Sequence, residues 1–455
     1  MSFTSLTFWI FFALVFSLHY LARTKSTQNI ILLIASYMFY AWLSPGYTLL
    51  LALLTLTDYF IALRMEHREK PRRLLWLSLV LNLGTLAFFK YFDLLNSNLQ
   101  DPLLVKIILP AGMSFYILKK LAYVIDVSRK TYPPVTSLVE FALFTAFFPQ
   151  LIAGPIDRAQ NLIPQIQRPR RWQTQALIDA WPLIVMGLFK KVVVADTLKS
   201  LVDRIFWIDS PAGIITLVGA LAFTVQILAD FSGYTDMARG IARLLGFETP
   251  ENFDTPYLSL TPSEFWNRWH ITLSHWLRDY IFFPTRRALV RHSPRPANWI
   301  IQSAPPLLTM FASGIWHGAG WTFVVWGLYY GVLIVIYQML GLGSWKPTVK
   351  WKQFLGWLVM FSLTVFGWLL FRAPSLGWVW TALTAPFIRT ASDLTVGLIA
   401  VSTIGFYALP LTVKSILDRR FSKDTWPQII FHAAVLTTTL VFINRGTADF
   451  IYAQF

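Results

Sequence analysis

The sequence has no cysteine, and only 14% of its 455 residues are charged. The absence of cysteine excludes disulfide bonds and thiol catalysis, and it removes any sign of the redox compartment. The shortage of charge, with a hydrophobic fraction of 55% and a mean hydropathy of +0.53, excludes a soluble domain of this length. Apolar runs of roughly 20 residues, long enough to cross a bilayer as helices, recur along the chain. The composition therefore predicts an all-α polytopic membrane protein.

Acidic residues are scarce as well, 23 against 39 lysines and arginines, which gives a net charge of +16. The basic residues are scattered in short loops between apolar segments, so we exclude nucleic acid as a partner and interpret the charge as a topology signal. They follow the first, third and fifth predicted spans, whereas the turns at residues 44–46 and 94–102 have none. Alternate loops are therefore predicted to be cytoplasmic, with the N-terminus outside.

Several familiar sequence signals are missing. Residues 3–22 lack a basic leading region and a small-residue cleavage site, so we expect a retained first span rather than a signal peptide. No HExxH or comparable ligand spacing occurs, and we predict no metal site. The lack of an internal repeat weakens the case for a transporter built from inverted repeats.

Polar or helix-breaking residues interrupt the apolar runs. Residues 147–155 hold two prolines and a glycine, which predicts a broken or re-entrant segment buried in protein. The run 181–194 is interrupted by Lys190-Lys191. The span 214–231 is predicted to end in polar residues that include Gln226 and Asp230, which are one helical turn apart and share a face. A polar lining and a helix end in water both stay open. Later spans are predicted at residues 351–371, 394–416 and 429–443.

The best-specified helix begins at Thr261, which with Pro262 and Glu264 forms a capping box with proline at the first position. We expect one continuous helix as far as Tyr280. At a period of 3.6 residues, its polar stripe consists of Ser263, Asn267, His270, Ser274 and Arg278. The stripe would either lie among lipid headgroups or line a wet cavity. His275 lies off this stripe and is interpreted as structural.

The basic residues at 286–295, which follow this helix, are predicted to form a cytoplasmic loop. Such a loop could also attract a polyanionic cofactor such as a nucleotide.

His317 lies in the apolar run 307–340, among residues that would otherwise sit in hydrocarbon. A titratable side chain in such a place is a functional-site hypothesis by default. Gly318 and Gly320 weaken the helix where the histidine falls, so we expect the imidazole to face an opening. The alternative is a buried histidine bonded to a carbonyl of the next helix.

Five short strings together resemble the membrane-bound O-acyltransferase family, in the bacterial branch that acts in alginate O-acetylation. They are residues 148–155 (FPQLIAGP), 230–236 (DFSGYTD), 264–270 (EFWNRWH), 314–318 (GIWHG) and 450–452 (FIY). Each string alone is weak, but their order matches the family over almost the whole chain.

The resemblance implies a single integral-membrane domain, residues 1–455, with about eleven spanning helices and additional re-entrant and interfacial helices around a central funnel or tunnel. It implies a catalytic histidine at His317 and a second functional one at His270. The donor would be a cytoplasmic thioester, acetyl-CoA, with no permanently bound cofactor. A periplasmic acetyltransferase or acceptor protein would complete O-acetylation of an exported polysaccharide. The protein would lie in the bacterial inner membrane, with the lipid bilayer as its surroundings.

The chemistry agrees with these implications, because a thioester is already activated and needs only a base and correct alignment. We predict His317 as the general base, and His270 with Asn267 as the groups that orient or polarise the carbonyl. Substrate-binding positions are predicted at Asn267, Trp316, Trp269 and Ser274, the tryptophans as tunnel wall. Two alternatives stay open: D-alanyl transfer to teichoic acid from a carrier-protein thioester, and a transporter or flippase with pathway histidines.

Overall fold

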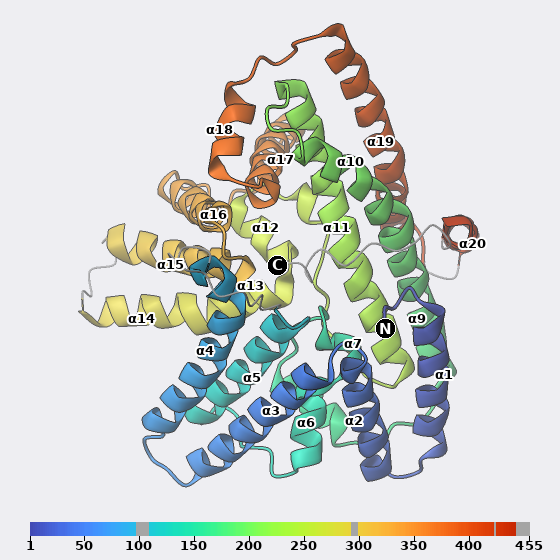
Figure 1. The fold of residues 1–455 in the computed structure, drawn as a ribbon, viewed down its shortest axis with the longest axis vertical. Coiled ribbons are helices and arrows are strands. Elements are labelled where there is room, and N and C mark those ends of the chain that lie inside the picture. The colour runs from blue at the N-terminus through green and yellow to red at the C-terminus, as the bar shows by residue number, and fades with distance from the viewer. Residues whose placement is uncertain (97–108, 293–298, 423–424, 443–455) are drawn as a thin grey trace. The chain divides into compact units, whose positions relative to one another are not determined.

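A computed structural model describes residues 1–96, 109–292, 299–422 and 425–442. In these ranges the chain is helical apart from its loops and one isolated bridge, and no strand forms. The predicted all-α class is confirmed. The described residues form two compact units, the first within 1–185 and 234–251 and the second within 186–233 and 252–442. Figure 1 shows the order of the elements.

The first unit is built from short and medium helices with polar caps. Ser5 and Thr24 are N-caps whose side chains accept hydrogen bonds from the first turns of the helices that follow them. The helices of this unit are α1 (Leu6–Leu21), α2 (Lys25–Ala41), α3 (Pro45–Glu66), α4 (Arg72–Asn96), α5 (Met113–Ser128), α6 (Leu138–Ala146), α7 (Phe148–Leu151), α8 (Ala159–Ile166) and most of α9 (Thr174–Leu188).

The predicted broken segment is confirmed. Helix α6 ends at Ala146, because Pro149 cannot continue it, and a four-residue helix, α7, follows after Phe147. Its backbone is satisfied within the protein, since the Phe148 N–H donates to Ser36 Oγ at 3.1 Å. Gln150 is buried and accepts a hydrogen bond from Lys119 Nζ at 2.8 Å. Irregular backbone at membrane depth is tolerated only where protein surrounds it, and these contacts supply that surrounding.

The second unit contains longer helices and two π-helical turns. Its elements are the end of α9, the π-helix η1 (Phe189–Ala195), α10 (Asp196–Phe206), most of α11 (Gly213–Leu244), the 3₁₀ turn η2 (Pro256–Leu258), α12 (Pro262–Arg268), α13 (Ile271–Leu277), the π-helix η3 (Arg278–Phe282), α14 (Phe283–His292), α15 (Trp299–His317), α16 (Trp321–Met339), α17 (Lys350–Arg372), α18 (Leu376–Thr384), α19 (Ala391–Arg420) and α20 (Trp426–Phe442).

Helix α11 corrects the prediction that its span ends near residue 231. The helix runs for 32 residues without a break, and Gln226 and Asp230 lie inside it, 3% and 1% exposed. The polar group does not end the helix because Asp230 is neutralised internally: Lys191 Nζ lies 2.7 Å from its Oδ1. A helix end in water is therefore excluded for these two side chains.

Basic residues 286–292 are also helical, in α14, rather than in the predicted loop. Residues 293–295, which complete that predicted loop, and the string 450–452 lie outside the described residues. Two of the three later spans are confirmed as α17 and α19, although α19 extends to Arg420. The third predicted span, 429–443, corresponds to α20, a 17-residue apolar helix that is shorter than the six candidate spans; residue 443 lies outside the described residues.

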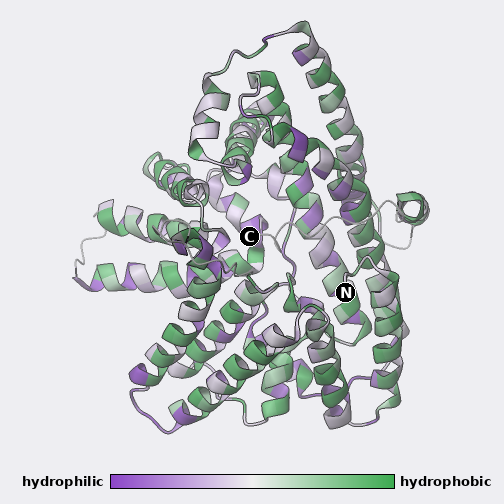
Figure 2. Ribbon diagram, viewed as in Figure 1, coloured by the Kyte–Doolittle hydropathy of each residue, from purple (hydrophilic) through white to green (hydrophobic). Residues whose placement is uncertain are grey.

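Six helices in the described ranges are long and apolar enough to cross a membrane, and two shorter apolar helices, α1 and α20, accompany them. The six are α3, α4, α11, α16, α17 and α19. Figure 2 shows the hydrophobic residues along these helices, and many of them are exposed on the protein surface. The chain is thus a multi-pass membrane protein, and the figure of about eleven spans stays a prediction.

Helices α15 and α16 form a closely packed hairpin around the predicted catalytic histidine. A Cβ atom on Gly314 would lie 2.4 Å from the carbonyl oxygen of Phe323, and one on Gly327 would lie 2.3 Å from that of Met310. Only residues without a side chain let the two backbones approach this closely. The hairpin therefore fixes the end of α15, where His317 lies.

Candidate active site

The helix predicted to run from Pro262 to Tyr280 is broken, and His270 lies at the break. Helix α12 ends at Arg268 and α13 begins at Ile271. Between them His270 adopts φ 42° and ψ 54°, a left-handed conformation that is uncommon for residues other than glycine. The prediction of one continuous helix is wrong, and with it the placing of His270 on the same stripe as Asn267.

A neighbouring segment holds this break in place. Phe253 pairs with Trp269 in an isolated antiparallel bridge, and the Ile271 N–H donates to the Asn252 carbonyl at 3.0 Å. Asn252 Oδ1 accepts from both the N–H and the hydroxyl of Thr272, at 3.2 and 2.7 Å. Strained backbone persists only where its surroundings over-determine it, and these bonds do so. The sequence reasoning missed Asn252, because its partners are 19 and 20 positions away.

His317 is the last residue of α15, directly before Gly318. Its Nδ1 lies 2.7 Å from the carbonyl oxygen of Ser313, one turn earlier in the same helix. A carbonyl can only accept, so Nδ1 carries the proton and Nε2 presents its lone pair. The bond goes to its own helix, whereas the sequence reasoning considered only a carbonyl of the next one.

The imidazole of His317 is surrounded by aromatic rings rather than by the expected opening. Its centroid lies 4.8 Å from that of Trp326 and 5.4 Å from that of Phe371, and the residue is 3% exposed. The tight α15–α16 hairpin brings Trp326 against the histidine, which the weakened helix end alone would not have done.

The structure brings the two predicted histidines together around Trp316. The Trp316 ring centroid lies 4.8 Å from that of His317 and 6.3 Å from that of His270. Phe231 of α11 covers His270 from another side, at 4.7 Å between ring centroids. Helix α11 therefore adds a wall to the site that local sequence spacing did not suggest.

The electrostatics of His270 follow from this setting. The residue is fully buried, and it lies at a junction of two short helices rather than in a spanning helix. Burial, and then the nearby His317, hold the pKa of His270 well below its usual range. At neutral pH its imidazole is uncharged, and it can donate or accept a hydrogen bond as a neutral group.

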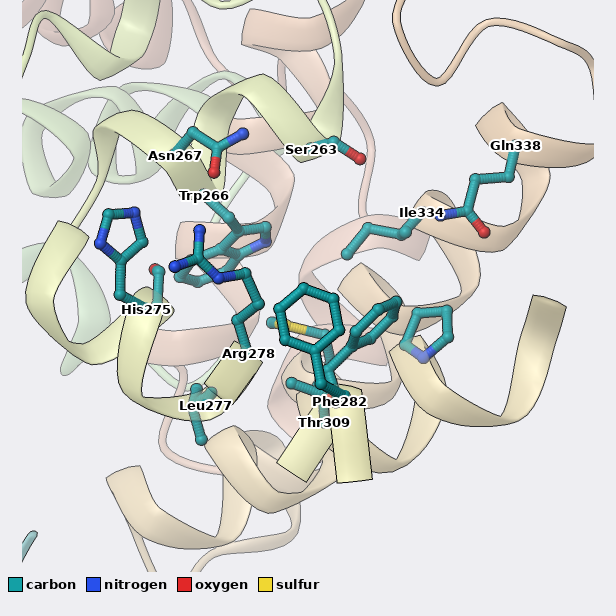
Figure 3. Close-up of a pocket in the computed structure, with 14 residues that line it drawn as sticks. Ser263, Trp266, Asn267, His275, Leu277, Arg278, Phe282, Thr309, Ile334 and Gln338 are labelled. Carbon is teal, nitrogen blue, oxygen red and sulfur yellow. The ribbon is translucent and has the colours of Figure 1, made fainter. Parts of the chain in front are cut away.

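A cavity of about 210 Å³ opens beside these helices. Polar side chains of the predicted stripe line it, and Figure 3 labels Ser263, Asn267 and Arg278 among them, together with His275. Ser274 is a further lining residue from this stripe. The Arg278 guanidinium lies 6.0 Å from the ring centroid of Phe283, another lining residue, and its Nε–H donates to Asp279 Oδ1 at 3.1 Å. The break at His270 explains why this histidine is buried, whereas the other polar residues of the predicted stripe line the cavity.

Trp269 and Ser274, both predicted to bind substrate, differ in their surroundings. Trp269 is fully packed, 4.6 Å from Trp368 and 5.0 Å from Phe253 between ring centroids, and it does not line the cavity. Ser274 lines it while its hydroxyl donates to the Trp269 carbonyl at 3.1 Å. His275, interpreted from sequence as structural, is a lining residue. The sequence reasoning set His275 aside because it lies off the polar stripe, whereas the structure places it at the cavity together with Ser274 of the same helix, α13.

These features define a class: an all-helical, multi-pass membrane protein with a buried histidine pair and a nearby cavity that other polar and apolar side chains line. The family model described as the membrane-bound O-acyltransferase family matches residues 32–371. That range runs through both compact units. The chain belongs to this family and is an O-acyltransferase.

Curated relatives agree on acyl transfer and differ in the acceptor. The chain is 35% identical to the probable alginate O-acetylase AlgI of Azotobacter vinelandii, over 93% of this chain and 89% of the relative. It is 32% identical to a peptidoglycan O-acetyltransferase of Helicobacter pylori, over 79% and 74%. It is 26% identical to a teichoic acid D-alanyltransferase of Bacillus subtilis, over 57% and 68%. Because the chain belongs to a family of acyltransferases, the transporter alternative is discarded.

Proposed function

We propose that this enzyme passes an acetyl group from acetyl-CoA, bound on the cytoplasmic side, across the membrane to an acceptor hydroxyl, for O-acetylation of an exported polysaccharide such as alginate. The observation that carries the proposal is the histidine pair at Trp316, in which the Ser313 carbonyl fixes the tautomer of His317. The two O-acetylating relatives are also more similar to this chain, and over more of it, than the D-alanyltransferase.

In the proposed reaction His317 is the general base. Its Nε2 takes the proton from the acceptor hydroxyl while that oxygen attacks the thioester carbonyl carbon. The tetrahedral intermediate collapses, the carbon–sulfur bond breaks, and the proton passes from His317 to the leaving thiolate. The bond to Ser313 orients the ring and stabilises the imidazolium that forms transiently.

The neutral His270 supplies polarity without charge. Its imidazole is suited to donate a hydrogen bond to the carbonyl oxygen, where negative charge develops. A permanently charged group would be costly in this aromatic surrounding, because burial penalises charge. Asn267 and Ser274 bind substrate from the cavity, and Trp316 forms a wall beside both histidines.

We further propose the inner membrane as the location, with the N-terminus outside, on the distribution of basic loops. A periplasmic acetyltransferase or acceptor protein would receive the acetyl group for transfer to the polysaccharide. No permanently bound cofactor takes part.

The test is turnover of radiolabelled acetyl-CoA by the purified protein in detergent. We compare wild type with His317→Ala and with His292→Ala as the matched control. His292 makes the same bond to the carbonyl four residues earlier, at 2.7 Å, but on an exposed helix. The proposal requires that wild type and His292→Ala release or transfer acetyl, and that His317→Ala does not. If wild type does not turn over acetyl-CoA but does turn over a D-alanyl carrier-protein thioester, the D-alanyl alternative is established.

A further inference from the structure

A second cavity, of about 260 Å³, lies within the unit formed by residues 1–185 and 234–251. Its polar lining includes three arginines and no acidic side chain: Tyr20, Gln165, Arg168, Arg170, Arg171 and Gln173. Basic residues in loops usually point to solvent, so three of them around one cavity require a separate explanation.

Arg170 is built into the floor of this cavity by neutral partners. Gln28 clamps its backbone, accepting from the Arg170 N–H at 2.9 Å and donating to the Arg170 carbonyl at 2.8 Å. Asn29 Oδ1 accepts from Nη2 at 2.7 Å, and the guanidinium lies 5.0 Å from the Phe247 ring centroid. The residue is 7% exposed. A fixed positive charge is thus held in place without a counterion.

The positive charge of the cavity is not compensated. Among the described residues no carboxylate forms an ion pair with Arg168, Arg170 or Arg171, and the Nε–H of Arg170 finds no acceptor. Glu248, close by in sequence, pairs instead with Arg243. A buried charge without a partner is costly, and arginine forks match phosphate oxygens in pairs. The arrangement fits a phosphate group.

A glycine brings the backbone close to this site. Gly246 has φ +82°, and a Cβ atom there would lie 2.9 Å from Cγ of Arg170 and 3.5 Å from the Tyr20 hydroxyl. The Tyr20 hydroxyl donates to the Leu244 carbonyl at 2.8 Å, so it is held at the rim. Arg170, Tyr20 and Gly246 are therefore positioned groups of the cavity, and the exposed Arg168 and Arg171 add charge to it.

The surroundings of the cavity are those of a membrane interface. Leu18 and Leu21 of α1 and Leu177 and Ile178 of α9 are exposed apolar residues that flank its lining in sequence. Trp172 is exposed and contacts the ring of Tyr20, with centroids 5.6 Å apart. Tryptophan and tyrosine gather at headgroup level, and apolar side chains beside them face acyl chains. Figure 2 shows α1 as predominantly hydrophobic.

We propose that this cavity binds the phosphate of an anionic phospholipid headgroup, with the acyl chains against α1 and α9. Basic pockets between membrane helices are known to take such headgroups. A soluble phosphate, including those of an acyl-CoA, offers the same oxygens but has no use for the flanking apolar residues. The site is therefore a lipid site of the enzyme, separate from acyl transfer itself.

The test measures phosphatidylglycerol and phosphatidylcholine binding to the detergent-purified protein by native mass spectrometry, without acetyl-CoA. The variant is Arg168→Gln with Arg171→Gln, both exposed and so compatible with folding. The matched control is Arg68→Gln with Arg72→Gln, two exposed arginines of the same unit outside the cavity. One basic residue near an anionic lipid is worth about fivefold in affinity, so the variant should lose about 25-fold for phosphatidylglycerol.

The control should bind phosphatidylglycerol like wild type, and phosphatidylcholine should bind weakly to all three proteins. Unchanged phosphatidylglycerol binding by the Arg168/Arg171 variant would overturn the proposal, as would an equal loss in the control. Displacement of the lipid from wild type by inorganic phosphate or acetyl-CoA would also overturn it and assign the site to a soluble phosphate. Because no acyl transfer is measured, failure of the proposed acetyl transfer leaves this result unaffected.

Discussion

Nδ1 of His317 lies 2.7 Å from the carbonyl oxygen of Ser313, and this single bond decides which nitrogen of the imidazole is basic. Because Nδ1 is committed as a donor, Nε2 is the atom that can take a proton. We expect His317→Gln to lower kcat by about 10²- to 10⁴-fold, the usual contribution of general base catalysis. Binding of acetyl-CoA should change little. Single-turnover transfer and donor binding measure the two effects separately, and a variant with wild-type kcat would remove His317 from the chemistry.

The lowered pKa of His270 predicts a pH dependence of stability. The unfolded chain binds a proton at His270 near pH 6.5, whereas the folded protein does so only at much lower pH. Stability is therefore fully present above about pH 6.5 and is lost as the pH falls below it, by up to about 1.4 kcal/mol per pH unit. His270→Gln should flatten this part of the profile. Thermal unfolding in detergent between pH 4.5 and pH 8 checks it, and parallel profiles for the two proteins would contradict the prediction.

Asn252 and Asn267 form a matched pair for separating support from substrate binding. Asn252→Ala removes the acceptor of the Thr272 N–H and hydroxyl, and we expect a loss of about 1–3 kcal/mol of stability with a misplaced His270. Asn267 is exposed at the cavity, so Asn267→Ala should keep the stability and raise KM. Unfolding midpoints and steady-state kinetics distinguish the two. The reverse pattern would show that the break at His270 does not depend on Asn252.

The buried ion pair between Lys191 and Asp230 should contribute to the stability of the folded protein. Lys191 also lies 2.9 Å from Asp196, so Lys191→Met leaves two carboxylates without their cation. We expect a loss of about 3–5 kcal/mol, the cost of breaking a buried pair. Lys414→Met, which breaks the exposed pair with Asp418, is the control and should cost about 1 kcal/mol or less. Equal thermal shifts for the two variants would contradict the burial argument.

The α15–α16 hairpin gives a packing prediction. A methyl group at Gly327 would meet the Met310 carbonyl at 2.3 Å, whereas none of the surrounding atoms lies within 4 Å of a methyl group at Gly84. Gly327→Ala should force the helices apart, displace Trp326 from His317 and lower both stability and kcat. Gly84→Ala should be neutral or stabilise by about 1 kcal/mol, because alanine favours helix. Melting temperature and turnover are the readouts, and a harmless Gly327→Ala would mean that the hairpin can relax.

Local sequence determined much of the architecture. The apolar runs predict the spanning helices because hydrocarbon tolerates little else, and Pro149 predicts the break after α6 because it cannot continue a helix. Thr261 is the N-cap as predicted, with its side chain accepting from the Glu264 N–H at 3.1 Å. The reciprocal half of the predicted capping box does not form, because the Glu264 carboxylate accepts from the Leu260 N–H, at 2.8 Å, rather than from that of Thr261. Gly318 ends α15 where the sequence places His317. These signals act over a few residues, so they can be interpreted without knowing the fold.

Only the tertiary structure decided the arrangement of the site. The left-handed turn at His270 depends on Asn252, and the continuation of α11 depends on Lys191 neutralising Asp230. Neither effect appears in helical periodicity, because each is a contact between segments far apart in the chain. The sequence by itself placed His317 in an apolar run, but it placed His270 on a polar stripe. Long-range hydrogen bonds and ring packing decided that they meet at Trp316, because such contacts supply the energy that overrides local helix propensity.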